Sequence, residues 1–331
     1  MSGTFAAADA VELATVTRDG FIESRHVGSA VVLNPEGEII GSYGAPEALV
    51  YPRSALKPFI SVAVMTSGIT LRGEDAAIAT ASHTGTMMHV AKVKTLLSRV
   101  GLDERALQCP PMYPENADAR ELVIRDKLRA QPIFHGCSGK HAGLLAACVT
   151  NDWSIDTYLD TDHPIQVKIR EVIERLTGER PTAPTIDGCG TPLYAMSLVA
   201  LARGMQRIAM SNSSSPFALH REAGALGQAI RENPVIIRGP GEPESIAIER
   251  LGVVSKLGFE GVQLTVAPNG TAVALKTLDG SLRPGIPVAL ALLARHGGLS
   301  PEAVAETMPL VSPMLLGGSR QVGTVIPTVG E

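Results

Sequence analysis

The segment Arg53-Ser54-Ala55-Leu56-Lys57-Pro58-Phe59 follows Tyr51-Pro52 and opens an apolar run that extends to residue 65. The proline before the segment disfavours helical backbone at its neighbour, and Pro58 is tolerated in a first helical turn, so a helix is expected to begin near Ser54. One turn then places the Ser54 hydroxyl and the Lys57 amine on the same face. A neutral lysine there accepts a serine proton, and the positive end of the helix favours the negative charge that develops. The alternative is an ordinary helix start with an exposed lysine, because both residue types are common.

The composition is that of a globular enzyme. The chain has 331 residues, of which 45% are hydrophobic and 19% are charged, which is enough for one large domain or two smaller ones with a buried core. The formal net charge of -4 argues against a nucleic-acid partner or an anionic membrane. No apolar run has the length of a transmembrane helix, and residues 1–13 lack the basic start and apolar centre of a signal peptide. We therefore expect a cytoplasmic protein with no membrane partner.

Strands are predicted at both ends of the chain, with helices between them. Residues 11–45 have the composition of antiparallel strands, with a turn at Asn34-Pro35-Glu36-Gly37, and residues 252–280 have that of strands separated by short turns. Terminal strands that join one antiparallel sheet, with helices packed on it, make an α+β fold. No composition break marks a linker. We therefore expect a single domain over residues 1–331, with a helical region of about residues 60–250 inserted between the terminal strands.

Several polar or Gly-rich stretches are poorly explained as core; they are residues 54–57, 82–85, 135–143, 187–192 and 255–258. The fourth precedes an expected helical run over residues 195–202. A Ser-x-x-Lys on a helix, a serine on a loop and a Lys-x-Gly on a late strand follow the same order in penicillin-recognising enzymes and class A β-lactamases. Two differences exist, because Ser82-His83-Thr84 lacks the asparagine of Ser-Asp-Asn and Leu257 replaces the hydroxyl residue of Lys-Thr-Gly. Lys276 is a rival lysine, but no glycine follows it, so Lys256 is preferred.

The chain has too few cysteines for a disulfide scaffold of this size; they are Cys109, Cys137, Cys148 and Cys189. Cys137 and Cys189 lie in Gly-rich turns and, with Lys140 and His141, are candidates to surround a metal ion. Zinc favours thiolate and imidazole ligands, and four ligands suit it. A lysine ligand is unusual, since the amine must be neutral to bind a metal. The alternative is that both cysteines are buried small residues.

Taken in chain order, the motifs form a specific combination: Pro52-Arg53-Ser54-Ala55-Leu56-Lys57-Pro58-Phe59, Ala81-Ser82-His83-Thr84-Gly85, Cys137-Ser138-Gly139-Lys140-His141-Ala142-Gly143, Asp187-Gly188-Cys189-Gly190 and Lys256-Leu257-Gly258-Phe259-Glu260-Gly261. Together they resemble the rhizobial-type (class 3) L-asparaginases, from about Glu12 to the C-terminal region. The resemblance implies a serine β-lactamase-like fold, in which an antiparallel sheet is packed with helices. It also implies a homodimer that hydrolyses L-asparagine to L-aspartate and ammonia. This family is unrelated to the bacterial asparaginases that use threonine nucleophiles.

Catalytic roles follow from the same resemblance. Ser54 and Lys57 match one Ser-Lys pair, and Ser82 and Lys256 match a second. In the expected mechanism Ser54 attacks the side-chain amide carbon with Lys57 as base, and the second pair passes a proton to the leaving ammonia. Water then hydrolyses the aspartyl ester. Backbone N–H groups near Ser54 and on the late strand are expected to hold the oxyanion. The sequence leaves open which serine attacks, because each has a lysine partner.

The resemblance further implies one zinc ion, held by Cys137, Lys140 and Cys189 with water completing the shell. This ion is expected to orient the substrate or the cleft rather than activate water, because a nucleophile is already present. The substrate-side positions implied in the same way are Arg53, His141 and Asp187. Asp187 is expected to pair with the substrate ammonium and Arg53 with its carboxylate; the alternative is a surface ion pair of small energetic worth.

Three other functions remain open at the level of sequence. A glutaminase or broader amidase would use the same residues. A penicillin-recognising hydrolase or esterase would acylate Ser54, although the cysteine-containing loops argue against it. A metal-stabilised binding protein with an inactive cleft is the alternative that is not an enzyme.

Overall fold

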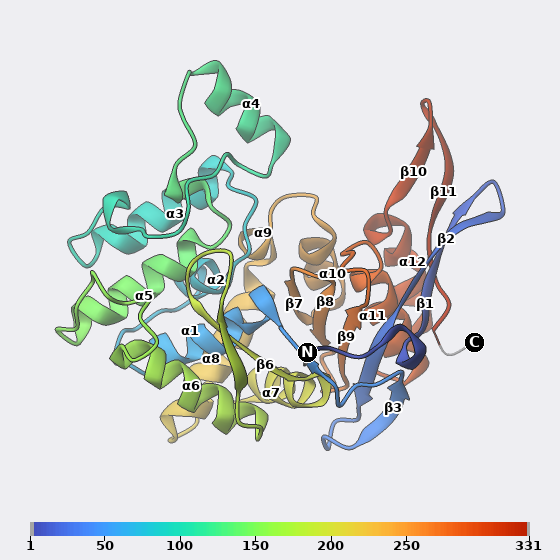
Figure 1. Cartoon of the computed structure of the whole chain (residues 1–331), viewed down its shortest axis with the longest axis horizontal. Helices are drawn as coiled ribbons and strands as arrows, with labels where there is room; N and C mark the ends of the chain where they lie inside the picture. Colours follow the sequence, from blue (N-terminus) through green and yellow to red (C-terminus); the bar gives the residue numbers. More distant parts are fainter. Residues whose placement is uncertain (1–2, 330–331) are drawn as a thin grey trace.

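One large antiparallel sheet organises the computed structural model, which describes residues 3–329 (Figure 1). The strands are β1 Val11–Arg18, β2 Phe21–Leu33, β3 Ile39–Tyr43, β4 Leu49–Val50, β5 Thr182–Ile186, β6 Pro192–Ser197, β7 Val254–Gly258, β8 Val262–Val266, β9 Ala272–Thr277, β10 Met314–Gly317 and β11 Arg320–Pro327. The large sheet has eight strands in the order β10-β11-β1-β2-β9-β8-β7, with β3 paired to β2 off this path. A smaller sheet has the order β4-β6-β5.

The helices lie mainly between β4 and β7 in the chain. They are α1 Lys57–Met65, α2 Glu74–Thr80, α3 Met87–Ser98, α4 Ala117–Arg125, α5 Ser138–Thr150, α6 Pro164–Thr177, α7 Leu198–Met210, α8 Ala218–Glu232, α9 Pro234–Ile237, α10 Pro243–Leu251, α11 Gly285–Arg295 and α12 Pro301–Val311. Short 3-10 turns occur at η1 Ala7–Asp9, η2 Arg53–Leu56, η3 Glu104–Ala106 and η4 Pro132–Phe134. Within residues 3–329, no helix combines the length and the apolar character needed to cross a membrane.

Strands from the two ends of the chain pair directly, which confirms the predicted α+β arrangement. β2 pairs antiparallel with β9, with Ala30 opposite Leu275, and β1 pairs antiparallel with β11. The turn predicted at residues 34–37 is present. The Asn34 N–H donates to the Glu38 carbonyl at 2.9 Å, and the Asn34 side chain accepts from the Glu38 N–H at 2.8 Å.

Helices cover the centre of the large sheet on both faces. Every residue of β8 and β9 is buried, although alternate residues of a strand point to opposite faces. Helix α7 packs against β2, β8 and β9, and α11 packs against β8 and β9. Figure 1 shows α1, α2, α3, α5 and α6 gathered at the left of the molecule, whereas α10, α11 and α12 overlap the strands of the large sheet. The helical region therefore meets the sheet through α7 on one face and through α8 and α10 at β7.

The helix predicted over residues 195–202 begins later than expected. Residues up to Ser197 form strand β6, which pairs with β4 and β5. Ser197 ends the strand because its side chain accepts a hydrogen bond from the Ala200 N–H and caps α7. All residues of β6 are buried, so its sequence lacks the alternation of apolar and polar residues that marks a half-exposed strand. The sequence pattern there therefore did not distinguish a strand from a helix.

A glycine lets strand β7 approach the turn that carries Ser54. A Cβ atom added at Gly258 would lie 2.1 Å from the Pro52 carbonyl oxygen and 3.0 Å from the Ala55 nitrogen. Only glycine permits this contact between two backbones. The glycine of the Lys-x-Gly motif therefore sets the distance between Lys256 and the Ser54 turn.

We predict that Gly258→Ala lowers the free energy of unfolding by about 1–3 kcal/mol, because the new methyl group overpacks the contact. Chemical denaturation measures this change. Gly285→Ala is the matched control, since its added Cβ would meet Gln263 at an ordinary 3.5 Å. Equal stability of the two variants would contradict the assigned role of Gly258.

Candidate active site

Ser54 lies in a strained turn at the wall of a cavity. Arg53, the residue before it, has a φ of 53°, in the left-handed region that non-glycine residues rarely adopt. The 3-10 turn η2 then carries Ser54, and α1 begins at Lys57, with Pro58 in its first turn. The predicted helix start is therefore confirmed, although its first turn is a 3-10 turn. Ser54 is 3% exposed and lines a cavity of about 180 Å³.

Lys57 is fully buried and makes three hydrogen bonds through its amine. Nζ lies 2.6 Å from the Ala81 carbonyl oxygen, 2.9 Å from the Gly136 carbonyl oxygen and 3.0 Å from the Ser82 hydroxyl. Carbonyl oxygens accept hydrogen bonds and cannot donate them. A neutral Lys57 amine therefore gives its two hydrogens to the carbonyls and directs its lone pair at the Ser82 hydroxyl.

Lys256 reaches the same hydroxyl from the opposite side. Its Nζ donates to Ser82 Oγ at 2.9 Å and to the Leu257 carbonyl oxygen at 3.1 Å. The expected contact between Ser82 and Lys256 is present, but the expected contact between Ser54 and Lys57 is replaced by one between Lys57 and Ser82. Within residues 3–329, no hydrogen bond joins the Ser54 hydroxyl to a protein group. The cause is the direction of the Lys57 side chain, which the Ala81 and Gly136 carbonyls draw toward Ser82.

Burial lowers the pKa of both amines. Desolvation is the main cause for Lys57, and the Cys137 sulfur acts in the opposite direction. Desolvation also lowers the pKa of Lys256 to about 8, although the Glu244 carboxylate opposes it. A lysine with a pKa near neutrality exchanges protons readily. The two amines therefore suit a chain of proton transfers through Ser82.

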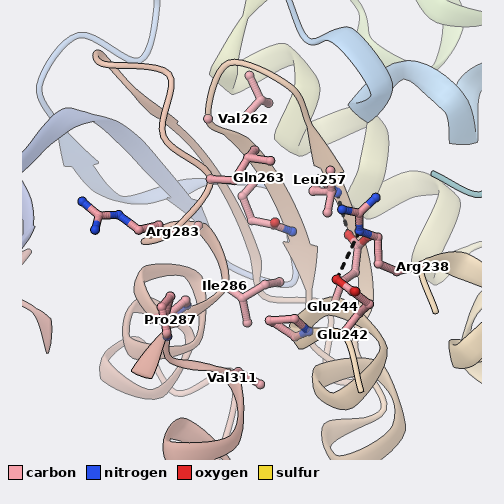
Figure 2. A pocket seen from close by; sticks show the side chains of 15 residues that line it. Arg238, Glu242, Glu244, Leu257, Val262, Gln263, Arg283, Ile286, Pro287 and Val311 are labelled. Atoms are coloured by element: carbon pink, nitrogen blue, oxygen red, sulfur yellow. Dashed lines mark hydrogen bonds and ion pairs between the residues drawn. The ribbon is translucent and has the colours of Figure 1, made fainter. Parts of the chain in front are cut away.

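Glu244 is a buried carboxylate that sequence reasoning missed. It is 1% exposed, and its Oε2 lies 3.8 Å from Lys256 Nζ. Its Oε1 accepts from the Leu257 N–H at 2.6 Å, so that N–H is not free to hold an oxyanion as expected. Glu244 also lines a second cavity, of about 230 Å³. Figure 2 shows Arg238, Glu242 and Glu244 on one wall of it, facing Gln263 and Ile286.

Two ion pairs face the cavity beside Ser54. Arg53 Nε lies 2.6 Å from Asp187 Oδ1, so the two residues expected to bind opposite ends of a substrate pair with each other. Arg238 Nη1 donates to Glu115 Oε2 at 2.9 Å and to the Ser82 carbonyl oxygen at 2.8 Å. A small zwitterion that enters this cavity therefore meets two ion pairs, Arg53–Asp187 and Arg238–Glu115, each with one positive and one negative group.

The expected metal ligands converge in the structure. Lys140 Nζ donates to Cys189 Sγ at 2.9 Å and to Thr191 Oγ1 at 2.7 Å. A hydrogen bond from Cys137 and the charge of Lys140 lower the pKa of Cys189, while burial opposes them. The same Cys137–Cys189 contact, together with burial, raises the pKa of Cys137. Burial lowers the pKa of Lys140, but the Cys189 and Cys137 sulfurs outweigh it and raise the pKa overall. We infer that the Lys140 ammonium pairs with the Cys189 thiolate and that the neighbouring Cys137 is a thiol.

Two of the three donors in this group, the sulfurs of Cys137 and Cys189, are of the kind that zinc prefers. The third, the amine of Lys140, is an unusual zinc ligand. The buried Nε2 of His141 has no hydrogen-bond partner among residues 3–329, while its Nδ1 lies 2.7 Å from the Tyr158 hydroxyl. In the same part of the chain, no three His, Cys, Asp or Glu side chains are arranged to hold a metal ion. A three-residue site here therefore needs Lys140 as its third donor.

The cavity wall contains both expected and unexpected residues. The expected ones that line it are Arg53, Ser54, Lys57, Ser82, Cys137, Asp187 and Cys189. Lys140, His141 and Lys256 lie behind the wall, so His141 does not face the cavity as its expected substrate role requires. The lining side chains that were not among the expected site residues are Met112, Glu115, His135, Arg238 and Phe259. His135 and Phe259 lie in stretches that the sequence motifs include, and a Gly-Pro-Gly run typical of a turn follows Arg238.

We predict that a small thiol reagent such as methyl methanethiosulfonate modifies Cys189 before Cys137 at neutral pH. The reason is that thiolates react and thiols do not, and it is Cys189 whose sulfur accepts a hydrogen bond from the Lys140 amine at 2.9 Å. Peptide mass spectrometry of chelator-treated protein measures the order. Cys148 is the matched control and should stay unmodified, because burial raises its pKa to about 12. Modification of Cys137 first would contradict this charge assignment.

Comparison with known proteins places the chain in a family. Solved structures with a similar backbone include Mglu in its glutamate form, at 11% identity over 82% of this chain and 61% of that one, with a TM-score of 0.47. They also include a Bacillus glutaminase, at 12% identity over 83% of this chain and 92% of that one, with a TM-score of 0.45. A beta-lactamase from Mycobacterium bovis is 13% identical over 81% of this chain and 94% of that one, with a TM-score of 0.42.

The chain spans about three fifths of the length of Mglu. No curated protein matches the chain. The sequence model of the L-asparaginase II family matches residues 14–327. Because that match covers nearly the whole chain, the protein belongs to the L-asparaginase II family.

Proposed function

We propose that the protein hydrolyses the side-chain amide of L-asparagine to L-aspartate and ammonia through a serine acyl-enzyme. One observation carries the proposal: the hydroxyls of Ser54 and Ser82 line one cavity of about 180 Å³ in a member of the L-asparaginase II family. That volume is below the roughly 300–1,000 Å³ of pockets for drug-sized ligands and suits an amino acid. The ion pairs Arg53–Asp187 and Arg238–Glu115 supply charges for the substrate carboxylate and ammonium.

Ser54 is the proposed nucleophile, because its hydroxyl is not engaged by another group of the described chain. Its Oγ bonds to the amide carbon, and its proton passes to the Lys57 amine, which must first turn from the Ser82 hydroxyl toward Ser54. Ser82 gives its hydrogen to the leaving nitrogen and takes one from Lys256, to which it is hydrogen-bonded at 2.9 Å. The carbon–nitrogen bond breaks and ammonia leaves. Lys57 is then protonated and Lys256 is neutral.

Deacylation restores both lysines. Water attacks the aspartyl ester and loses a proton through Ser82 to Lys256. Lys57 returns its proton to Ser54 as the ester bond breaks, and L-aspartate leaves. Ser82 therefore moves a proton in opposite directions in the two halves of the cycle, which its contacts with two amines support.

We predict faster ammonia release from L-asparagine than from L-glutamine, because the small cavity disfavours an extra methylene. Steady-state kinetics with both substrates measures the ratio of kcat/KM.

Ser54→Ala should lower kcat with asparagine by at least about 1,000-fold, which is the typical effect of losing a serine nucleophile. Ser61→Ala is the matched control, since this buried hydroxyl on α1 has no hydrogen-bond partner within residues 3–329. Full activity of Ser54→Ala would contradict the mechanism.

We also propose that Cys137, Lys140 and Cys189 hold a zinc ion. Lys140 must give up its proton to donate to the metal, so zinc affinity should rise with pH. A bound zinc would supply positive charge beside the cavity and orient a substrate there. Asp187 and Cys189, which lie on the same turn and line the cavity, would connect that charge to the substrate.

We predict that Cys189→Ser lowers the zinc content of the purified protein from about one ion per chain toward zero, because a serine hydroxyl is a poor zinc ligand. Elemental analysis by mass spectrometry measures it. Cys148→Ser, a buried change outside this group of side chains, is the control and should keep its zinc. Unchanged zinc in Cys189→Ser would remove Cys189 from the ligand set.

A further inference from the structure

The buried carboxylate of Glu244 accepts hydrogen bonds from both neighbours of Lys256 in strand β7. Glu244 lies in the first turn of α10 and reaches across to strand β7. Its Oε1 accepts from the Leu257 N–H at 2.6 Å and from the Ser255 hydroxyl at 3.4 Å. These two residues flank Lys256 in the strand. The position of Lys256 along β7 therefore depends on Glu244.

The other carboxylate oxygen of Glu244 faces Lys256 alone. Glu244 Oε2 is buried, has no hydrogen-bond partner among residues 3–329, and lies 3.8 Å from Lys256 Nζ. Lys256 itself is completely buried. A buried carboxylate without a compensating charge is strongly unfavourable. The arrangement is therefore stable when Lys256 carries a proton.

The remaining charged groups around Lys256 come from three other elements. Arg238 after α9 is positive and opposes the charge of Lys256, and Lys57 at the start of α1 does the same whenever it is protonated. The Cys137 sulfur at the start of α5 acts in the favourable direction but contributes less than Glu244. The Arg238 charge is partly balanced by Glu115 and Glu242. Glu244 is the one carboxylate within ion-pair distance of Lys256 in the described chain.

We propose that Glu244 is a positioning residue that holds Lys256 in place and keeps it protonated, so that Lys256 can restore the proton of Ser82. This proposal rests on the proposed function, in which Ser82 gives its hydrogen to the leaving nitrogen. The Lys256 N–H bond then breaks as a new Ser82 O–H bond forms, and Lys256 regains the proton from the attacking water. Glu244 neither gains nor loses a proton in this cycle.

The test compares two glutamate variants of the same cavity wall. Glu244→Gln keeps an oxygen for the Leu257 N–H but removes the charge beside Lys256. Glu242→Gln is the matched control, because Glu242 pairs with Arg238 and contacts neither Lys256 nor Ser82. Activity that needs protonated Lys256 is lost as pH rises through the pKa of this lysine. Glu244→Gln should therefore move the alkaline limb of kcat/KM to lower pH by about one unit or more, and Glu242→Gln should not.

A measurement independent of turnover completes the test. In ¹⁵N-lysine-labelled protein, with the signal of Lys256 assigned by Lys256→Arg, the wild-type Lys256 amine should be protonated at neutral pH. Its titration midpoint should fall in Glu244→Gln. A neutral Lys256 in the wild-type protein, or equal alkaline limbs in wild type and Glu244→Gln, would overturn the proposal.

The outcomes separate this proposal from the proposed function. If Glu244→Gln does not fold, the wild-type titration decides, since it requires no variant at position 244. If asparagine hydrolysis fails but the Lys256 midpoint falls in Glu244→Gln, the proposed function is wrong and the ion pair stands. If hydrolysis requires Lys256 but the alkaline limb of kcat/KM is the same in wild type and Glu244→Gln, the proposed function stands and the proposed role of Glu244 is wrong.

Discussion

The Ser82 hydroxyl lies 3.0 Å from the Lys57 amine and 2.9 Å from the Lys256 amine, and both amines are buried. A hydroxyl can donate one hydrogen bond and accept two, so it can contact both amines at once, but it passes a proton between them only when they differ in protonation. The surroundings supply that difference. Two carbonyl oxygens face Lys57, whereas a carboxylate faces Lys256. The rest of the site is arranged to maintain this asymmetry.

The fold brings these groups together from distant parts of the chain. Lys57 begins α1, Ser82 follows α2, and Lys256 lies in β7 at the edge of the large sheet. Gly258 allows β7 to touch the Ser54 turn, and Arg238 fixes the Ser82 loop through its carbonyl oxygen. Removing one partner of a buried ion pair such as Lys256–Glu244 is strongly destabilising, because it leaves the other charge unpaired. Stability and proton transfer therefore depend on the same side chains.

Much of this arrangement was predictable from local patterns, and the rest depends on the directions of long side chains. The strands at the two chain ends, the Asn34 turn and the helix start near Ser54 follow from composition and proline geometry. The exchange of partners, in which Lys57 contacts Ser82 instead of Ser54, depends on the Ala81 and Gly136 carbonyls. No sequence pattern encodes those backbone positions. Glu244 was missed for a similar reason, because a glutamate in a first helical turn is ordinary until the strand that it contacts is known.

The central claim is that Ser54 attacks while Ser82 relays protons. Rapid acid quenching during turnover of L-asparagine, followed by peptide mass spectrometry, locates the covalent intermediate directly. The account predicts an aspartyl ester on the peptide that contains Ser54 and none on the peptide that contains Ser82. An ester on Ser82 would contradict the account and would make Ser82 the nucleophile.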